Sequence, residues 1–179
     1  LWPLSRKSYP KQFLNFKGKN TLLQNRVLFA KKNKKIKFEN PIILTNEVYR
    51  FIIREQLKEV GVEPNQIIIE PETKNTAPAI LAAALYLKNK NPNSIMLVCP
   101  SDHLIPQVKL FEECILRGLE LLKKGELITF GIKPTKPETA YGYLRLSESS
   151  NLIPQKLSGF IEKPEKEKAK KMLASGNYL

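Results

Sequence analysis

The feature that most constrains the fold is a regular alternation of short apolar runs with helical stretches. Four apolar runs have the length of a strand: 41–45 (PIILT), 67–70 (IIIE), 95–99 (IMLVC) and 127–132 (LITFGI). Three helical patterns lie between them: one capped by Asn46 and ended by Gly61, an Ala-rich one over 77–87, and one over 109–124. Strands of nearly continuous hydrophobicity that alternate with helices form mainly parallel sheets covered on both faces. The sequence therefore predicts a doubly wound α/β fold.

The last third of the chain follows a different pattern. Residues 141–146 (YGYLRL) and 157–162 (LSGFIE) roughly alternate apolar with polar side chains, and turn residues separate them. This alternation predicts antiparallel strands appended to the sheet, followed by a short helix over 165–174. In an open α/β sheet the loops after the parallel strands meet at one edge, where ligands bind. We expect the functional residues to follow the predicted strands for that reason.

An irregular basic segment precedes the first predicted strand. Residues 1–16 (LWPLSRKSYPKQFLNF) have no clear periodicity, and Thr21 and Gln24 then form the capping-box pattern of a helix. A basic loop that leads into a helix is suited to hold an anion, although a surface loop with dispersed charges has the same composition. A doubly wound sheet normally starts with a strand, so we expect the first strand of this domain to lie before Leu1.

The composition limits which classes of ligand or partner the protein is expected to bind. The formal net charge is +13, which suits nucleic acid, anionic membranes or phosphorylated substrates. The basic runs 31–37 and 163–171 have no nucleic-acid-binding motif beside them, so the sequence disfavours nucleic acid as a partner. No apolar run reaches the about 18–20 residues of a membrane helix, and no signal peptide is evident. Together with two unpaired cysteines, Cys99 and Cys114, which we expect to be buried thiols, this predicts a cytoplasmic protein.

Five segments, in this order, resemble the sequence signature of sugar-nucleotide pyrophosphorylases, in the form typical of mannose-1-phosphate guanylyltransferases. They are LWPLSRKSYPKQF (1–13), EPETKNTAPA (70–79), PSDHLI (100–105), PETAYGYL (137–144) and GFIEKP (159–164). The resemblance implies a Rossmann-like nucleotidyltransferase domain that transfers GMP from GTP to mannose 1-phosphate, giving GDP-mannose and pyrophosphate with the help of Mg²⁺. A sugar phosphate is already mostly ionised at neutral pH, so this reaction needs positioning and charge neutralisation rather than a general base.

The resemblance assigns the nucleotide to residues of the first three motifs. Lys11 matches the signature lysine that contacts the phosphates, and Arg6 or Lys7 adds to that positive field. The resemblance implies that five residues bind the guanine: Glu70, Pro71, Asn75, Thr76 and Ala77. From the residues alone, Asn75 or Thr76 also suits an N-cap of the Ala-rich helix, and Lys11 suits an ordinary exposed lysine. Asp102 matches one of two aspartates that hold Mg²⁺, a metal that prefers oxygen ligands.

The resemblance assigns the sugar phosphate to the last two motifs. Tyr141, Gly142 and Tyr143 match the stretch whose backbone approaches the sugar, since a glycine permits close contact. Glu162 and Lys163 match a pair that holds the sugar hydroxyls and the sugar phosphate. The alternative for this pair is an exposed Glu–Lys contact at a strand end.

Three hypotheses share these motifs. The first is an active guanylyltransferase, complete in its natural context or complemented by a neighbouring chain. The sequence is also compatible with a homo-oligomer. The second is an inactive truncated remnant that binds nucleotide or sugar phosphate weakly. The third is a related pyrophosphorylase of different sugar or base specificity. In each case we expect residues 1–179 to be one partial nucleotidyltransferase domain, with the Gly-rich phosphate loop and a second aspartate outside it.

Overall fold

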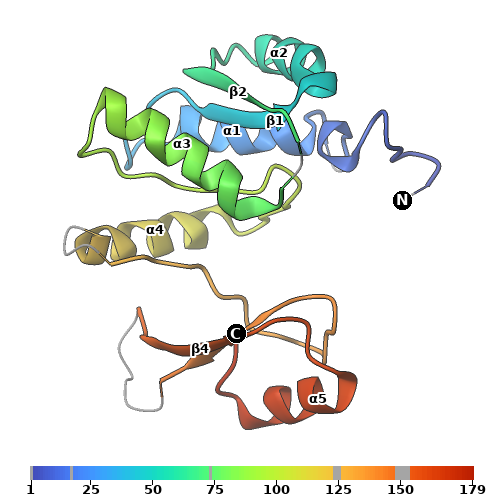
Figure 1. Ribbon diagram of the computed structural model, residues 1–179, viewed down its shortest axis with the longest axis vertical. Helices are drawn as coiled ribbons and strands as arrows, with labels where there is room; N and C mark the ends of the chain where they lie inside the picture. The colour runs from blue at the N-terminus through green and yellow to red at the C-terminus, as the bar shows by residue number, and fades with distance from the viewer. Residues whose placement is uncertain (1, 17, 73, 123–125, 148–153) are drawn as a thin grey trace. The chain divides into compact units, whose positions relative to one another are not determined.

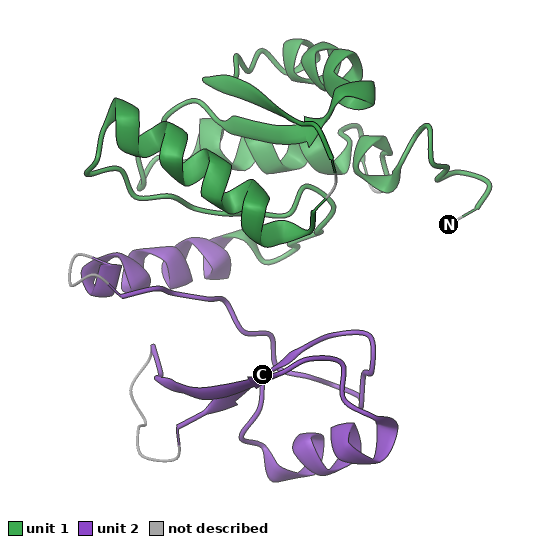
Figure 2. Ribbon diagram, in the orientation of Figure 1, with its two compact units in different colours: residues 1–108 green, residues 109–179 purple. Residues whose placement is uncertain are grey.

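The computed structural model describes residues 2–16, 18–72, 74–122, 126–147 and 154–179 (Figure 1). The chain divides into two compact units, residues 1–108 and residues 109–179 (Figure 2). The structure has the α/β fold that the sequence predicts, with a parallel pair of strands in unit 1 and an antiparallel pair in unit 2.

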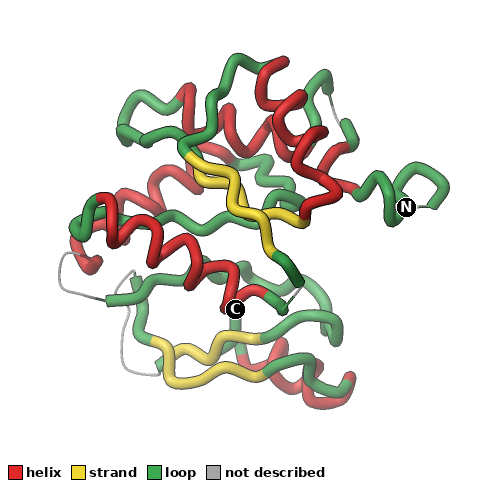
Figure 3. The backbone as a smooth tube through the Cα atoms, turned by 45° about the horizontal axis from the view of Figure 1, so that its top comes forward, coloured by secondary structure: helices red, strands yellow, loops and turns green. Residues whose placement is uncertain are grey.

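Unit 1 is built around a parallel pair of strands. Strands β1 (Ile42–Asn46) and β2 (Gln66–Glu70) run parallel, with Ile43 opposite Ile67. Helices α1 (Leu22–Lys32) and α2 (Arg50–Glu59) pack around one core with these two isoleucines. Because side chains alternate along a strand, the other face of the pair is left for α3 (Thr76–Lys90), which contacts both strands. Figures 1 and 3 show α2 and α3 on opposite sides of the strands.

The helices of unit 1 begin where the sequence predicts. Thr21 and Gln24 form the predicted capping box, in which each side chain bonds the other residue's backbone N–H. Asn46 accepts a hydrogen bond from the Val48 N–H at 3.0 Å and starts the short helix η2 (Glu47–Tyr49), which continues into α2. Gly61 follows α2 with a φ of 63°, a left-handed conformation that suits glycine.

Unit 2 holds the antiparallel pair. Helix α4 (Val108–Leu122) comes first, followed by β3 (Tyr143–Leu146), β4 (Leu157–Ile161) and α5 (Lys166–Ser175). Tyr143 lies opposite Ile161, and its buried ring packs with Ala169 and Met172 of α5. Leu179 exchanges two backbone hydrogen bonds with Leu144, at 2.8 and 3.0 Å, so the last residues run along the free edge of β3. The predicted antiparallel pair and the last helix are confirmed, with the pair forming a sheet of its own.

Two predicted strands are absent from the sheets that the structure describes. Residues 95–99 and 127–132 join no strand ladder. Several of their apolar side chains are exposed, with Leu127 at 96% and Ile132 at 80%. An apolar run indicates that a segment needs burial, but a strand also needs a neighbour to hydrogen-bond with, and neither segment has one within the described ranges. The prediction of strands over residues 95–99 and 127–132 was wrong for that reason.

Two smaller predictions can also be checked. No helix within the described part of the chain is long and apolar enough to span a membrane. Cys99 and Cys114 are both free thiols, but only Cys99 is partly buried, because Cys114 lies on the exposed face of α4. The expectation of a buried thiol at Cys114 was wrong.

Candidate functional site

An ion pair joins the two most strongly predicted nucleotide-site residues. Lys11 opens the short helix η1 (Lys11–Phe13), and Asp102 lies in the turn after residues 95–99. The Lys11 Nζ is 2.7 Å from an Asp102 carboxylate oxygen, and both side chains remain partly exposed. Two residues far apart in the sequence therefore place a cation and an anion side by side in unit 1, open to a charged ligand.

The surroundings of Asp102 favour its ionised form. Partial burial raises the pKa of the Asp102 carboxyl, but the hydrogen bond and charge of Lys11, with His103 nearby, outweigh burial and hold the pKa below its ordinary value. The Arg26 guanidinium donates to the His103 carbonyl oxygen at 3.0 Å and so ties this turn to α1. Asp102 is thus a carboxylate at neutral pH, paired with the Lys11 ammonium.

The turn that carries Lys11 is anchored by a residue that sequence reasoning missed. The Gln56 side chain, buried in α2, donates from Nε2 to the Phe13 carbonyl oxygen at 3.1 Å. Its Oε1 accepts from the Thr21 hydroxyl at 2.9 Å. A signal was present in the sequence, because Gln56 follows Ile53 at helical spacing and is a polar residue on the apolar face of α2.

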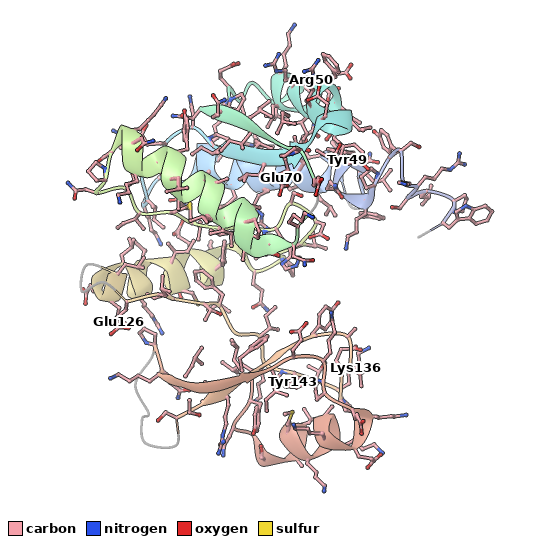
Figure 4. The ribbon with its side chains drawn as sticks, in the orientation of Figure 1. Tyr49, Arg50, Glu70, Glu126, Lys136 and Tyr143 are labelled. Carbon is pink, nitrogen blue, oxygen red and sulfur yellow. The ribbon has the colours of Figure 1, made fainter. Side chains whose placement is uncertain are left out.

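The other basic residues of the first motif make contacts of their own. The Arg6 Nε donates to the Pro3 carbonyl oxygen at 3.0 Å, and Arg6 and Tyr9 exchange backbone hydrogen bonds. The Lys7 carbonyl oxygen accepts from the hydroxyl of Tyr49, labelled in Figure 4. Among the residues that the structure describes, no recorded hydrogen bond or ion pair links Arg6 or Lys7 to Lys11 or Asp102.

The predicted guanine residues lie between the end of β2 and the first turn of α3. Glu70 ends β2 (labelled in Figure 4), and the other four are exposed: Pro71, Asn75, Thr76 and Ala77. Asn75 occupies the N-cap position, but its side chain makes no capping hydrogen bond, and Thr76 already lies inside the helix. Asn75 is therefore the N-cap residue by position, as the capping interpretation allowed, but neither side chain caps the helix. Asn75 has φ 64° and ψ −168°, a strained region that favours glycine and that persists mainly at functional sites.

The predicted sugar-phosphate residues come together in unit 2. A Cβ added to Gly142 would overlap the Phe160 ring, 2.6 Å from its Cε2, and would lie 3.0 Å from a Glu162 carboxylate oxygen. The Lys163 Nζ is 3.3 Å from the other Glu162 oxygen, and Lys163 has a left-handed φ of 41°. Tyr141 is 69% exposed beside them. Glycine at 142 thus allows β4 and its end to approach the loop before β3.

The Asp102 carboxylate suits a metal ion that a bound ligand also coordinates. Mg²⁺ commonly uses one or two protein carboxylates and completes its shell with waters and substrate phosphates. Asp102 supplies one ionised carboxylate, and the described residues contain no group of three or more metal-binding side chains. Asp102 therefore fits a metal shared with a nucleotide, and the described residues form no complete protein cage.

Comparisons with known proteins identify the family of this chain. A model of the family described as "Nucleotidyl transferase" matches residues 1–179. The chain belongs to this family. This nucleotidyl transferase chain is 42% identical over 178 residues to the xanthan biosynthesis protein XanB of Xanthomonas campestris pv. campestris. It is 41% identical over 184 residues to a mannose-1-phosphate guanylyltransferase of Escherichia coli.

These similarities extend over nearly all of the nucleotidyl transferase chain but over less than half of the length of the two curated relatives. The matches cover 99% of the chain, 37% of the Xanthomonas protein and 39% of the Escherichia coli protein. A crystal structure from Thermus thermophilus, described as a mannose-1-phosphate geranyltransferase, superimposes with a TM-score of 0.83 and 29% identity. That match covers 99% of this chain and 50% of the Thermus chain. The fold is thus shared along the whole chain, through both units.

Proposed function

We propose that this chain carries residues of a mannose-1-phosphate guanylyltransferase site, which transfers GMP from GTP to mannose 1-phosphate. The observation that carries the proposal is the Lys11–Asp102 pair at 2.7 Å, formed by two motifs of the guanylyltransferase signature. Membership of the nucleotidyl transferase family and the identity to a guanylyltransferase over 99% of the chain support it.

In the proposed reaction an oxygen of the mannose 1-phosphate attacks the α-phosphorus of GTP. The new oxygen–phosphorus bond forms as the bond from the α-phosphorus to the β-phosphate oxygen breaks, and pyrophosphate leaves. The attacking phosphate is mostly ionised at neutral pH, so no side chain needs to remove a proton. Lys11 would offset negative charge on the phosphates, because a fixed cation acts best where charge develops.

The remaining residues would bind and orient the two substrates. The uncapped start of α3 offers backbone N–H groups beside Asn75, Thr76 and Ala77 for the nucleotide. Glu162 would accept hydrogen bonds from sugar hydroxyls while the adjacent Lys163 meets the sugar phosphate. Asp102 would hold Mg²⁺ with the phosphates, and the bound ion would supply further charge neutralisation there.

The test is GDP-mannose formation from GTP and mannose 1-phosphate with Mg²⁺, measured by chromatography on the full chain. We expect Lys11→Met to lower turnover by about a hundredfold, the usual scale for removing one charge-stabilising donor. Lys37→Met is the matched control, because the Lys37 side chain is 91% exposed, and it should leave turnover unchanged. We expect Asp102→Asn to weaken the dependence on Mg²⁺.

Three results would contradict the proposal. Binding without turnover would favour the inactive remnant. Faster reaction with another nucleoside triphosphate or another sugar 1-phosphate would favour a related pyrophosphorylase. Equal losses of turnover in the Lys11 and Lys37 variants would show that Lys11 has no specific role at the phosphates.

A further inference from the structure

The hydroxyl of Tyr143 closes a loop onto the start of β3. The Tyr143 side chain is 3% exposed, and its ring packs in the core of unit 2. The hydroxyl oxygen accepts from the Glu138 N–H at 2.8 Å, and the hydroxyl donates to the Glu138 carbonyl oxygen at 2.9 Å. One side-chain group thus satisfies both backbone groups of a residue five positions earlier. Tyr143 and the neighbouring Lys136 are labelled in Figure 4.

The Glu138 side chain fixes the same loop from its other side. Its carboxylate accepts hydrogen bonds from the backbone N–H groups of Thr139 and Ala140. The Lys136 Nζ lies 3.1 Å from a carboxylate oxygen. Backbone and side chain of Glu138 are therefore both held, and residues 138–142, which we name the 138–142 loop, start from a fixed point.

The 138–142 loop ends on the residues predicted to bind the sugar. Gly142 lies against the Phe160 ring and close to the Glu162 carboxylate, with too little room for a side chain. The pairing of Tyr143 with Ile161 places the residues just before β3 beside those just after β4. Gly142 is thus the end of the loop that meets the Glu162 carboxylate.

We infer that the Tyr143 hydroxyl is a positioning group of the sugar-phosphate site, which holds the 138–142 loop with Gly142 against Glu162. This inference rests on the proposed function. A phenylalanine ring would supply the same packing against Ala169 and Met172, but only a tyrosine reaches the two backbone groups of Glu138. Loss of the hydroxyl would leave those groups unpaired in a partly buried setting and free the loop to rearrange.

The test compares Tyr143→Phe with Tyr86→Phe in the full chain. The control loses one hydroxyl as well, which in unit 1 donates to an Asn65 side-chain oxygen at 2.8 Å. In Tyr143→Phe we expect the Glu138 amide to exchange with solvent about tenfold faster by NMR, while the Leu144 amide keeps its protection. We expect the Kd for mannose 1-phosphate to rise about three- to tenfold and the Kd for GTP to stay constant. The control should change neither.

Each alternative result overturns the inference at a different step. Unchanged exchange at Glu138 would show that the hydroxyl does not hold the loop. Faster exchange with unchanged mannose 1-phosphate affinity would show that the loop is not part of the site. If the unsubstituted chain binds no mannose 1-phosphate, the proposed substrate is wrong, and the assignment of the loop to that substrate is wrong with it.

A measurement on the unsubstituted chain does not depend on how the variant folds. Tyr143 is a buried residue whose hydroxyl donates to the Glu138 carbonyl oxygen, so the hydroxyl proton should give a slowly exchanging NMR signal with a contact to the Glu138 backbone. A Tyr143 hydroxyl in fast exchange with water would overturn the inference regardless of any variant.

Discussion

At the scale of single residues, the pKa values of charged groups in the predicted site depend on their partners. Glu138 is a second example, in addition to Asp102 in the Lys11–Asp102 pair. The hydrogen bond and charge of Lys136 lower the pKa of the Glu138 carboxyl, a slight burial raises it, and the backbone N–H groups of Thr139 and Ala140 lower it further. The net pKa lies below the ordinary glutamate value, so the folded loop favours the carboxylate.

This shift predicts how the 138–142 loop responds to acid. A carboxyl whose pKa is lower in the folded state stabilises that state fully above its unfolded pKa, and the contribution disappears as the pH falls through the folded pKa. We expect the side-chain ¹³C signal of Glu138 to titrate below the ordinary range for glutamate. In Lys136→Met the midpoint should rise toward that range, because the largest cause of the shift is removed. A midpoint that does not move in Lys136→Met would contradict the ion pair between Lys136 and Glu138.

Residue identity was easier to predict than residue pairing. The motifs pointed separately to Lys11 and Asp102, but the contact between them depends on how η1 and the turn that carries Asp102 fold in three dimensions, which no local pattern contains. The left-handed backbones of Asn75 and Lys163 were also invisible, since neither residue is a glycine. Both belong to the predicted site, and strain of this kind is imposed by surrounding structure rather than by local preference.

At the scale of elements, a buried polar network joins the turn with Lys11 to two helices. Gln56 of α2 bonds both Phe13 in η1 and Thr21 at the start of α1. Gln24 of α1 donates to the Gln56 carbonyl oxygen at 3.0 Å and to Glu59 at 2.6 Å. Because a buried polar group costs most when its partner is removed, this network should respond strongly to a single substitution.

Gln56→Leu tests the network. We expect the free energy of unfolding to fall by about 1–3 kcal/mol, because the Phe13 carbonyl oxygen and the Thr21 hydroxyl lose their partner inside the protein. Urea unfolding followed by circular dichroism measures the change. Lys58→Leu, an exposed substitution on the same helix, is the control and should change stability by less than about 0.5 kcal/mol. Equal stability of the two variants would contradict the role given to Gln56.

Elements with strong local signals were predicted well, and elements that need a distant neighbour were not. The capping box at Thr21 and the Asn46 cap are local, and both helix starts are confirmed. Residues 95–99 have the apolar composition of a strand, yet Ile95 and Val98 are exposed, at 52% and 46%. A helix forms its backbone hydrogen bonds within itself, whereas a strand takes them from another segment, so an apolar run alone cannot guarantee a strand.

At the scale of the whole molecule, the predicted site residues divide between the two compact units. Unit 1 contains Lys11, Asp102 and the residues at the start of α3, and unit 2 contains Tyr141, Gly142, Glu162 and Lys163. The family match runs through both units, so both belong to one nucleotidyl transferase sequence. The proposed function gives each unit one substrate, with the nucleotide in unit 1 and the sugar phosphate in unit 2.

This division makes the contributions of the two units separable by binding measurements. We expect Lys163→Ala to raise the Kd for mannose 1-phosphate about tenfold or more, because a charge-assisted contact to phosphate is lost, and to leave the Kd for GTP nearly unchanged. Lys11→Met should do the reverse. Calorimetric titration of each ligand alone measures both constants without requiring turnover.

The control for Lys163→Ala is Lys166→Ala, an exposed lysine at the start of α5 in the same unit, which carries the same loss of charge. If the two variants weaken mannose 1-phosphate binding equally, the general positive field of unit 2 attracts the ligand, and Lys163 has no specific place in the site. If Lys163→Ala weakens the binding of GTP as much as that of mannose 1-phosphate, Lys163 also contacts the nucleotide. The assignment of one substrate to each unit would then be wrong. A loss confined to mannose 1-phosphate and to Lys163 would leave a specific contact as the remaining explanation, since screening by salt affects both lysines alike.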